Sequence, residues 1–129
     1  MRGDVSNPRT NPREPSLFEF QVSPNGRTLD VKVNSRKFDV SLAKEFRAAL
    51  DTVWVQGLTG VSVDFTSVEF IDSAGVGALI SVHKRFPAAP GGRAIDPSHQ
   101  PVSIINASPA VLTIIELLQL HRVFRLIRR

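Results

Sequence analysis

The residues with the clearest potential for chemistry lie together in mid-chain, in the stretch FIDSAGVGAL that begins at Phe70. An acid, Asp72, and a hydroxyl, Ser73, precede two glycines, Gly75 and Gly77, and apolar residues flank them on both sides. Serine and glycine in such a setting occur in three kinds of site. These are the active site of an enzyme with a nucleophilic serine, a glycine-rich loop that binds a nucleotide, and another kind of site that needs an exposed serine.

The stretch departs from the pattern of a serine hydrolase. In the Gly-x-Ser-x-Gly turn the first glycine allows a sharp bend, and Ile71 occupies that position here. A catalytic serine also needs a base within hydrogen-bond reach. His83 follows Ser73 on the same expected helix, about 15 Å along its axis, while His99 falls in an expected loop and His121 precedes the last expected strand. We therefore expect that the chain is not an enzyme.

The glycines do not match a nucleotide-binding loop either. Ile80 replaces the third glycine of Gly-x-Gly-x-x-Gly, and Gly75 and Gly77 lie inside the expected helix instead of before it. The chain has no cysteine, and its three scattered histidines lack the spacing of a metal site. We therefore expect no cofactor and no bound metal.

A purely structural role for Asp72 or Ser73 is to cap the following helix, because a short oxygen side chain accepts hydrogen bonds from the free N–H groups of the first turn. Gly75 and Gly77 argue for something more, since glycine inside a helix costs about 0.5–1 kcal/mol relative to alanine. We expect either another element of the fold or a partner to approach this turn closely.

Alternating apolar residues predict the strands that must position this stretch. The first two strands begin at Leu17 and Leu29, and the turn between them contains Asn25-Gly26, a pair that supplies the positive φ angles of a tight hairpin. Further strands are expected at 61–65, 102–105 and 123–127.

Apolar residues at helical spacing predict three helices. The first contains Leu42 to Val53 and begins at a cap, Asp39 or Ser41. The second covers roughly 73–85, and residues 87–101 after it are expected to form a long loop. The third begins at Ser108-Pro109, where serine caps the helix and proline takes its first position.

The element order β-β-α-β-α-β-α-β predicts an α/β domain with a mostly parallel central sheet and helices packed on the sheet. A length of 129 residues suits one domain. Residues 1–16 contain three prolines among polar residues and predict a flexible N-terminal tail. The domain is then expected to cover residues 17–129.

Charge and hydropathy indicate neither a nucleic-acid partner nor a membrane. The formal net charge is +4, and its densest basic group contains Arg122, Arg125, Arg128 and Arg129. A phosphate-binding patch would explain that group, but exposed arginines on a last strand explain it as well, and we prefer this second interpretation. There is no run of about 18 apolar residues and no signal-peptide pattern at the start. We expect no membrane insertion and a cytoplasmic location.

Taken together, these segments resemble the STAS domain of anti-sigma-factor antagonists. That family shows an Asp-Ser-x-Gly-Leu/Val-Gly motif between a strand and a helix, which Asp72 to Gly77 matches. Phe38-Asp39 resembles the family's Leu-Asp step into its first helix, and Asn106 to Val111 resembles the segment that opens its last long helix. The resemblance covers about residues 17–129 and implies a STAS-like single domain.

The resemblance implies a protein that binds an anti-sigma factor which is also a serine protein kinase. The unmodified form captures this kinase and frees the sigma factor. The kinase then phosphorylates the serine that corresponds to Ser73, the complex separates, and a metal-dependent serine phosphatase resets the protein. Nucleotide and Mg²⁺ belong to the kinase. The residues expected to contact partners are those of the motif and of the first helix start: Asp39, Asp72, Ser73, Ala74, Gly75 and Val76.

Three features depart from the family pattern and concern the surface that faces the partner. Arg36 stands where the family often has glycine, Leu42 stands where it often has serine or threonine, and the loop at 87–101 is long. The alternative function is a cytoplasmic STAS subunit of a lipid or anion transporter, in which no phosphorylation cycle is needed. The intact Asp72-Ser73 pair favours the antagonist. The sequence leaves the oligomeric state open.

Overall fold

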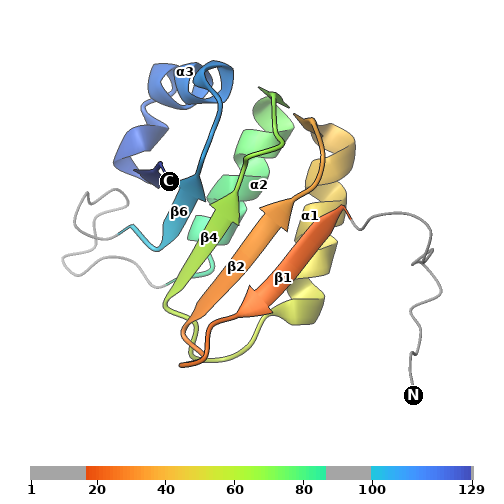
Figure 1. The fold of residues 1–129 in the computed structure, drawn as a ribbon, viewed down its shortest axis with the longest axis vertical. Coiled ribbons are helices and arrows are strands. Elements are labelled where there is room, and N and C mark those ends of the chain that lie inside the picture. Colours follow the sequence, from red (N-terminus) through yellow and green to blue (C-terminus); the bar gives the residue numbers. More distant parts are fainter. Residues whose placement is uncertain (1–16, 87–99, 129) are drawn as a thin grey trace.

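A computed structural model describes residues 17–86 and 100–128 of the chain. Its main sheet has five strands in the order β1-β2-β4-β6-β7 (Figure 1). The bounds of these strands are β1 Phe18–Val22, β2 Thr28–Val33, β4 Gly60–Asp64, β6 Val102–Ile105 and β7 Arg125–Ile127. In this sheet only the β1–β2 pair is antiparallel, and β2, β4, β6 and β7 run parallel to one another. The prediction of an α/β fold with a mostly parallel sheet is therefore confirmed.

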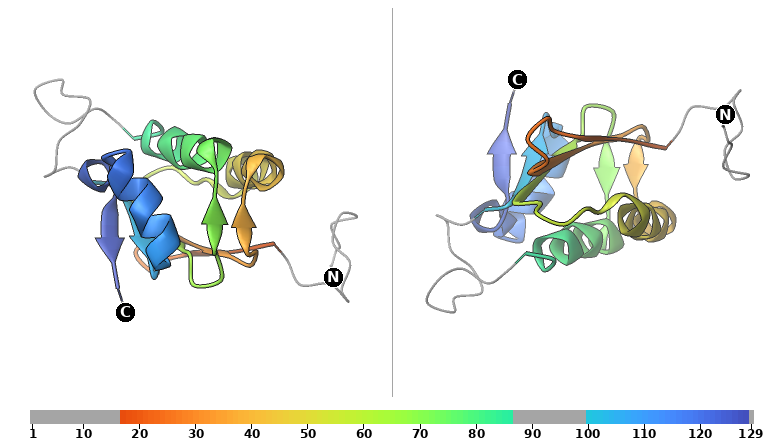
Figure 2. Two further views of the ribbon diagram at one scale, coloured as in Figure 1. Left: turned by 90° about the horizontal axis from the view of Figure 1, so that it is seen from above. Right: turned by 90° about the horizontal axis from the view of Figure 1, so that it is seen from below.

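The helices occupy two places around this sheet. α1 (Val40–Val53) and α2 (Ser73–His83) lie side by side over one face of the sheet, as Figure 2 shows from above and below. α3 (Pro109–Leu117) lies beyond the end of β6, and the short 3₁₀ helix η1 (Leu120–Arg122) leads from it toward β7 (Figure 1). Two helices thus cover the sheet as predicted, while the third lies at its end.

Two further strands, β3 (Lys37–Phe38) and β5 (Phe70–Ile71), pair with each other in parallel and form a separate small sheet. The sequence pattern does not predict these two strands, because two residues are too few to show the alternation that marks a strand. They are important for the site, since β3 leads into α1 and β5 leads into α2.

Aromatic side chains join the small sheet to the main core. Phe38 of β3 is fully buried, and its ring centroid lies 5.2 Å from that of Phe46 on α1 and 5.3 Å from that of Phe65 after β4. Burial of such rings contributes strongly to stability and holds neighbouring elements at fixed positions. The start of α1 is therefore anchored in the core through β3.

Some predicted boundaries differ from the structure. Gly26 has a positive φ of 73° but Asn25 does not. Instead, the Asn25 side chain accepts hydrogen bonds from the Ser23 hydroxyl and the Arg27 N–H, which closes a longer turn than the expected one. α2 ends at His83, and the last strand has only three residues. The expected tail at 1–16 and most of the expected loop at 87–101 lie outside the described residues.

Candidate functional site

Helices α1 and α2 begin next to each other because their preceding strands are paired. Lys37 lies opposite Phe70 and Phe38 lies opposite Ile71 in the β3–β5 pair, and an aspartate follows each strand. The two aspartates have nearly the same backbone conformation, with φ/ψ of −109°/−170° at Asp39 and −111°/−176° at Asp72. The chain thus repeats one strand–aspartate–helix arrangement at two adjacent positions.

Asp39 caps α1. One carboxylate oxygen accepts a hydrogen bond from the backbone N–H of Leu42 at 3.2 Å and another from the hydroxyl of Ser41 at 2.9 Å. Both donors favour the ionised form, so the Ser41 hydroxyl first and the Leu42 N–H second lower the pKa of Asp39 below its ordinary value. Of the two predicted caps, Asp39 is the one observed, and Ser41 supports it.

Asp72 caps α2 and also contacts α1. Its Oδ1 accepts from the backbone N–H of Gly75 at 2.9 Å, as an N-cap does. Its Oδ2 accepts from the backbone N–H of Val40, the first residue of α1, at 3.2 Å. A single carboxylate therefore satisfies free N–H groups at the starts of two helices.

Ser73 is the first residue of α2 and is exposed. Since Asp72 is the cap, the interpretation of Ser73 as the cap is wrong. Within the described part of the chain the Ser73 hydroxyl has no hydrogen-bond partner. It is therefore accessible and has no structural task there.

Gly75 is required by packing. A Cβ at this position would lie 2.1 Å from the carbonyl oxygen of Phe38, a contact that no side chain can make. For Gly75, the close approach expected from the sequence is therefore made by β3, an element of the fold. Gly77 differs, because a Cβ there would meet only Nη2 of Arg47, at 3.4 Å.

The predicted partner-binding residues divide into two groups. Asp39, Asp72, Ser73 and Ala74 reach the surface around the starts of the two helices, whereas Gly75 and Val76 are buried. The buried pair can only position the exposed residues.

The exposed apolar side chains near Ser73 were missed by the sequence analysis. Val40 is 68% exposed and Phe70 is 50% exposed, although both are large apolar residues. A signal for Phe70 was present: adjacent strand residues point to opposite faces, so Phe70 and Ile71 could not both enter the core. Ile71 is buried, and Phe70 points outward.

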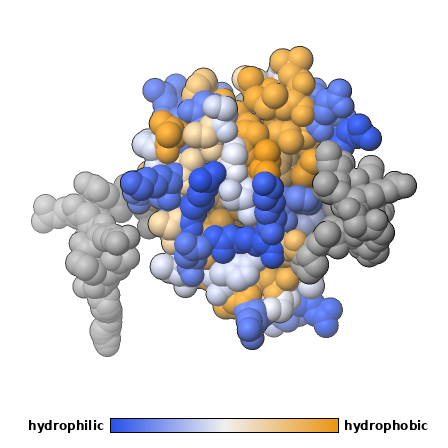
Figure 3. All heavy atoms as spheres, turned by 180° about the vertical axis from the view of Figure 1, so that it is seen from behind, coloured by the Kyte–Doolittle hydropathy of each residue, from blue (hydrophilic) through white to orange (hydrophobic). Residues whose placement is uncertain are grey.

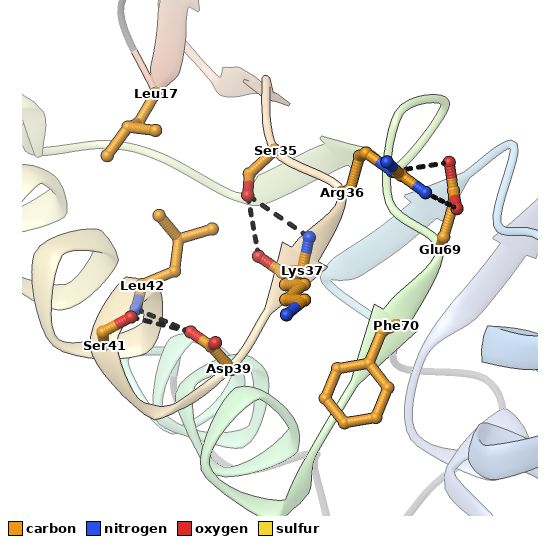
Figure 4. Close-up of a pocket in the computed structure, with 9 residues that line it drawn as sticks. All are labelled: Leu17, Ser35, Arg36, Lys37, Asp39, Ser41, Leu42, Glu69 and Phe70. Carbon is orange, nitrogen blue, oxygen red and sulfur yellow. Dashed lines mark hydrogen bonds and ion pairs between the residues drawn. The ribbon is translucent and has the colours of Figure 1, made fainter.

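A groove with a volume of about 590 Å³ lies beside this site. It extends from Leu17 and Leu42 across Lys37 to Phe70 (Figure 4). Its far wall carries an ion pair between Arg36 and Glu69, with nitrogen and oxygen 3.0 Å apart. The groove thus offers apolar contacts at both ends and charge between them.

A second exposed apolar surface lies on and just after α3, at the corner where apolar residues gather in Figure 3. It contains Ile114, Leu117 and Leu118, which are 37%, 75% and 54% exposed. Because α3 packs against β5, this surface borders the strand that carries Phe70.

The described residues include neither a metal-ligating cluster nor a membrane-spanning helix. There, no three histidine, aspartate or glutamate side chains gather in a way that could hold a metal ion. Among the described helices, none is long and apolar enough to cross a membrane. His83 lies at the far end of α2 from Ser73, as predicted.

A model of the STAS domain family matches residues 20–129, and the chain therefore belongs to the STAS domain family. A search of curated proteins finds no match to this chain.

Several solved structures share the fold. The anti-sigma factor antagonist SpoIIAA in its unphosphorylated form is 22% identical, with a TM-score of 0.54, and the match covers 78% of this chain and 82% of that one. The Bacillus cell fate determinant SpoIIAA in its phosphorylated form is 21% identical, with a TM-score of 0.56 and coverages of 84% and 89%. A proposed anti-sigma factor antagonist from Thermotoga maritima is 17% identical, with a TM-score of 0.63 and 85% coverage of both chains.

Proposed function

We propose that this chain is an anti-sigma factor antagonist whose binding is switched by phosphorylation of Ser73. In this proposal the unphosphorylated protein binds an anti-sigma factor that is also a serine protein kinase. The kinase transfers a phosphoryl group to Ser73, which ends the complex, and a serine phosphatase removes it. The protein needs no cofactor of its own, because the kinase holds the nucleotide. The likeness to SpoIIAA supports this proposal at the level of the fold.

One observation carries the proposal: Ser73 is an exposed hydroxyl at the start of α2, and Asp72 already performs the capping. A kinase can therefore reach and modify Ser73 without removing a hydrogen bond on which the described fold depends.

The charge of a phosphate explains how such a switch acts. Phosphorylation adds about −1.5 to −2 charges at neutral pH. The positive end of the α2 dipole stabilises an anion there by about 0.3–1 kcal/mol, while the neighbouring carboxylate of Asp72 opposes it. Because both electrostatic energies are small, the fold is expected to remain intact when Ser73 is phosphorylated. The surface around Ser73 changes its charge and size, and a loss of about 3 kcal/mol at the interface weakens binding more than a hundredfold.

The neighbouring apolar surface supports a partner-binding site around the starts of α1 and α2. Val40 and Phe70 flank the start of α2, and the groove of Figure 4 adjoins Phe70. Exposed aromatic and aliphatic side chains next to a polar rim are typical of protein interfaces. We assign partner contact to Asp39, Asp72, Ser73 and Ala74 together with Val40 and Phe70.

The first experiment is to isolate the protein from its own cells and to measure its intact mass and its peptide map. One phosphate on Ser73 is the expected result. In parallel, full-length Ser73→Ala and Ser73→Asp proteins serve as baits in those cells, with Ser67→Asp as a control at another exposed serine. Ser73→Ala and Ser67→Asp are expected to retain an anti-sigma factor kinase, and Ser73→Asp is expected to lose it. Retention of the kinase by all three baits, or capture of a transport protein in its place, would overturn the proposal.

A further inference from the structure

The surface of α2 carries a contact with α1 one helical turn after Ser73. The guanidinium of Arg47, from α1, lies over Gly77, with Nη2 3.4 Å from the position that a Cβ would take there, which is an ordinary contact distance. Apart from α2 itself, no other atom of residues 17–86 and 100–128 lies within 4 Å of that position. Packing in the core therefore explains Gly75 but not Gly77. At Gly77 the guanidinium of Arg47 rests on the surface of α2.

Arg47 has no carboxylate partner among residues 17–86 and 100–128. Two other arginines of the described chain are paired with carboxylates: Arg36 with Glu69 and Arg85 with Asp51. The acids nearest to the helix starts are already occupied: both oxygens of Asp72 accept backbone N–H groups, and Asp39 accepts from Ser41 and Leu42. Arg47 is thus an exposed cation whose guanidinium donates no hydrogen bond to any residue that the structure describes.

The contact over Gly77 brings the Arg47 guanidinium to the face of α2 on which Ser73 stands. Residues 73 and 77 are four apart, and side chains at this spacing stand on one face of a helix with Cβ atoms about 5–6 Å apart. A guanidinium over residue 77 therefore occupies the place of a basic side chain four positions after Ser73. Arginine is also the side chain best suited to bind a phosphate, because its planar fork donates two parallel hydrogen bonds.

We propose that Arg47 binds the phosphate of phosphorylated Ser73 and so joins α1 to α2 across the site. This inference rests on the proposed phosphorylation of Ser73. The two helices then hold the phosphate in one place, and the modified protein presents one defined surface to its partners. Gly77 keeps the path of the Arg47 side chain open, so a larger residue at position 77 weakens the contact.

Other charged groups near the starts of α1 and α2 act on the same phosphate. Lys37 on β3 and Lys44 on α1 attract it, and Asp39 and Asp72 repel it. The contribution of Arg47 must therefore be measured as a difference between variants that keep these four groups unchanged.

The test uses the full chain with phosphoserine incorporated at position 73 during synthesis, so that it needs no kinase. The second pKa of the phosphate, ordinarily about 6, is followed by ³¹P NMR in the otherwise unchanged protein and in the Arg47→Gln, Arg47→Lys and Arg27→Gln variants. Arg27 is an exposed arginine in the β1–β2 turn and serves as the matched control. An exposed charge pair is expected to lower the phosphate pKa by about 0.2–0.7 relative to Arg47→Gln.

The expected pattern is a higher phosphate pKa in Arg47→Gln, an intermediate one in Arg47→Lys and no change in Arg27→Gln. The difference should also shrink as salt is added, since exposed pairs are screened. A phosphate pKa in Arg47→Gln equal to that of the parent protein, with an unchanged circular-dichroism spectrum, overturns the inference. The proposed function fails separately, if the phosphorylated and unmodified proteins bind the anti-sigma factor kinase equally well.

Discussion

The carboxylate of Asp72, which caps α2, accepts a hydrogen bond from the backbone N–H of Val40, the first residue of α1, at 3.2 Å. This bond joins two helix starts that are 32 residues apart in sequence. Asp72 therefore lies between Ser73, the residue that we propose is phosphorylated, and α1, the helix that we expect to share in partner binding.

Asp72 should therefore contribute more to stability than an ordinary cap. Replacing Asp72 by alanine leaves the N–H groups of both Gly75 and Val40 without their partner, and we expect a loss of about 2 kcal/mol in the free energy of unfolding. Asp39→Ala, which removes a cap of α1 alone, should cost about 1 kcal/mol. Urea unfolding of the two variants measures the difference. Equal losses would show that the Asp72–Val40 bond contributes nothing.

Gly75 and Gly77 should respond differently to alanine. Gly75→Ala forces a methyl group against the Phe38 carbonyl, which belongs to a buried strand and cannot move aside, so we expect a loss of about 3 kcal/mol or failure to fold. Gly77→Ala meets only the flexible end of Arg47 and should leave stability unchanged or raise it by up to about 0.5–1 kcal/mol. Thermal unfolding followed by circular dichroism distinguishes the two. A stable Gly75→Ala protein would contradict the packing described for β3.

The cap of α1 should depend on pH. The hydrogen bonds from Ser41 and Leu42 lower the pKa of Asp39 in the folded protein. Asp39 therefore binds a proton more readily in the unfolded chain, and its contribution to stability is present at pH values above its ordinary pKa of 3.8. That contribution is lost as the pH falls through the lowered pKa that Asp39 has in the folded protein. Ser41→Ala removes the Ser41 hydroxyl, which contributes most to the lowered pKa of Asp39. NMR titration of the Asp39 carboxyl group should show its pKa move up toward 3.8 in this variant. If the pKa of Asp39 is unchanged in Ser41→Ala, the backbone hydrogen bonds alone lower it.

Phe70 should matter for binding and little for folding. Its side chain is half exposed, so Phe70→Ser should change the free energy of unfolding by less than about 1 kcal/mol. If Phe70 lies at the centre of the interface, its loss should weaken binding to the proposed partner, an anti-sigma factor kinase, at least tenfold, since buried aromatic anchors contribute more than about 1.4 kcal/mol. Isothermal titration calorimetry measures this affinity. Leu117→Ser, a change at a more exposed apolar side chain on α3, tests whether the apolar corner around α3 belongs to the same interface.

The sequence was sufficient for the elements with long and regular patterns. The five strands of the main sheet, the three helices and the cap at Ser108 follow from periodicity and from the chemistry of helix starts. For α1 the sequence offered Asp39 or Ser41 as the cap, and the structure identifies Asp39. The β3–β5 pair could not be predicted from such patterns, because its two-residue strands are defined by contacts between segments far apart in the chain. The double role of Asp72 and the position of Arg47 over Gly77 depend on that same pairing. The motif therefore identified Ser73 as the candidate serine, but the contacts around Ser73 could be described only from the structure.

The β3–β5 pairing also limits how the length of the chain can vary. Three residues, Asn34 to Arg36, connect β2 to β3. Deleting or inserting one residue there would slide β3 along β5 by about 3.3 Å and turn Phe38 out of the core. The start of α1 would move with it, out of reach of the Asp72 carboxylate. The connection from α1 to β4, which has six residues and touches neither helix start, carries no such restriction. Insertions and deletions among related chains should therefore be frequent between α1 and β4 and rare between β2 and β3.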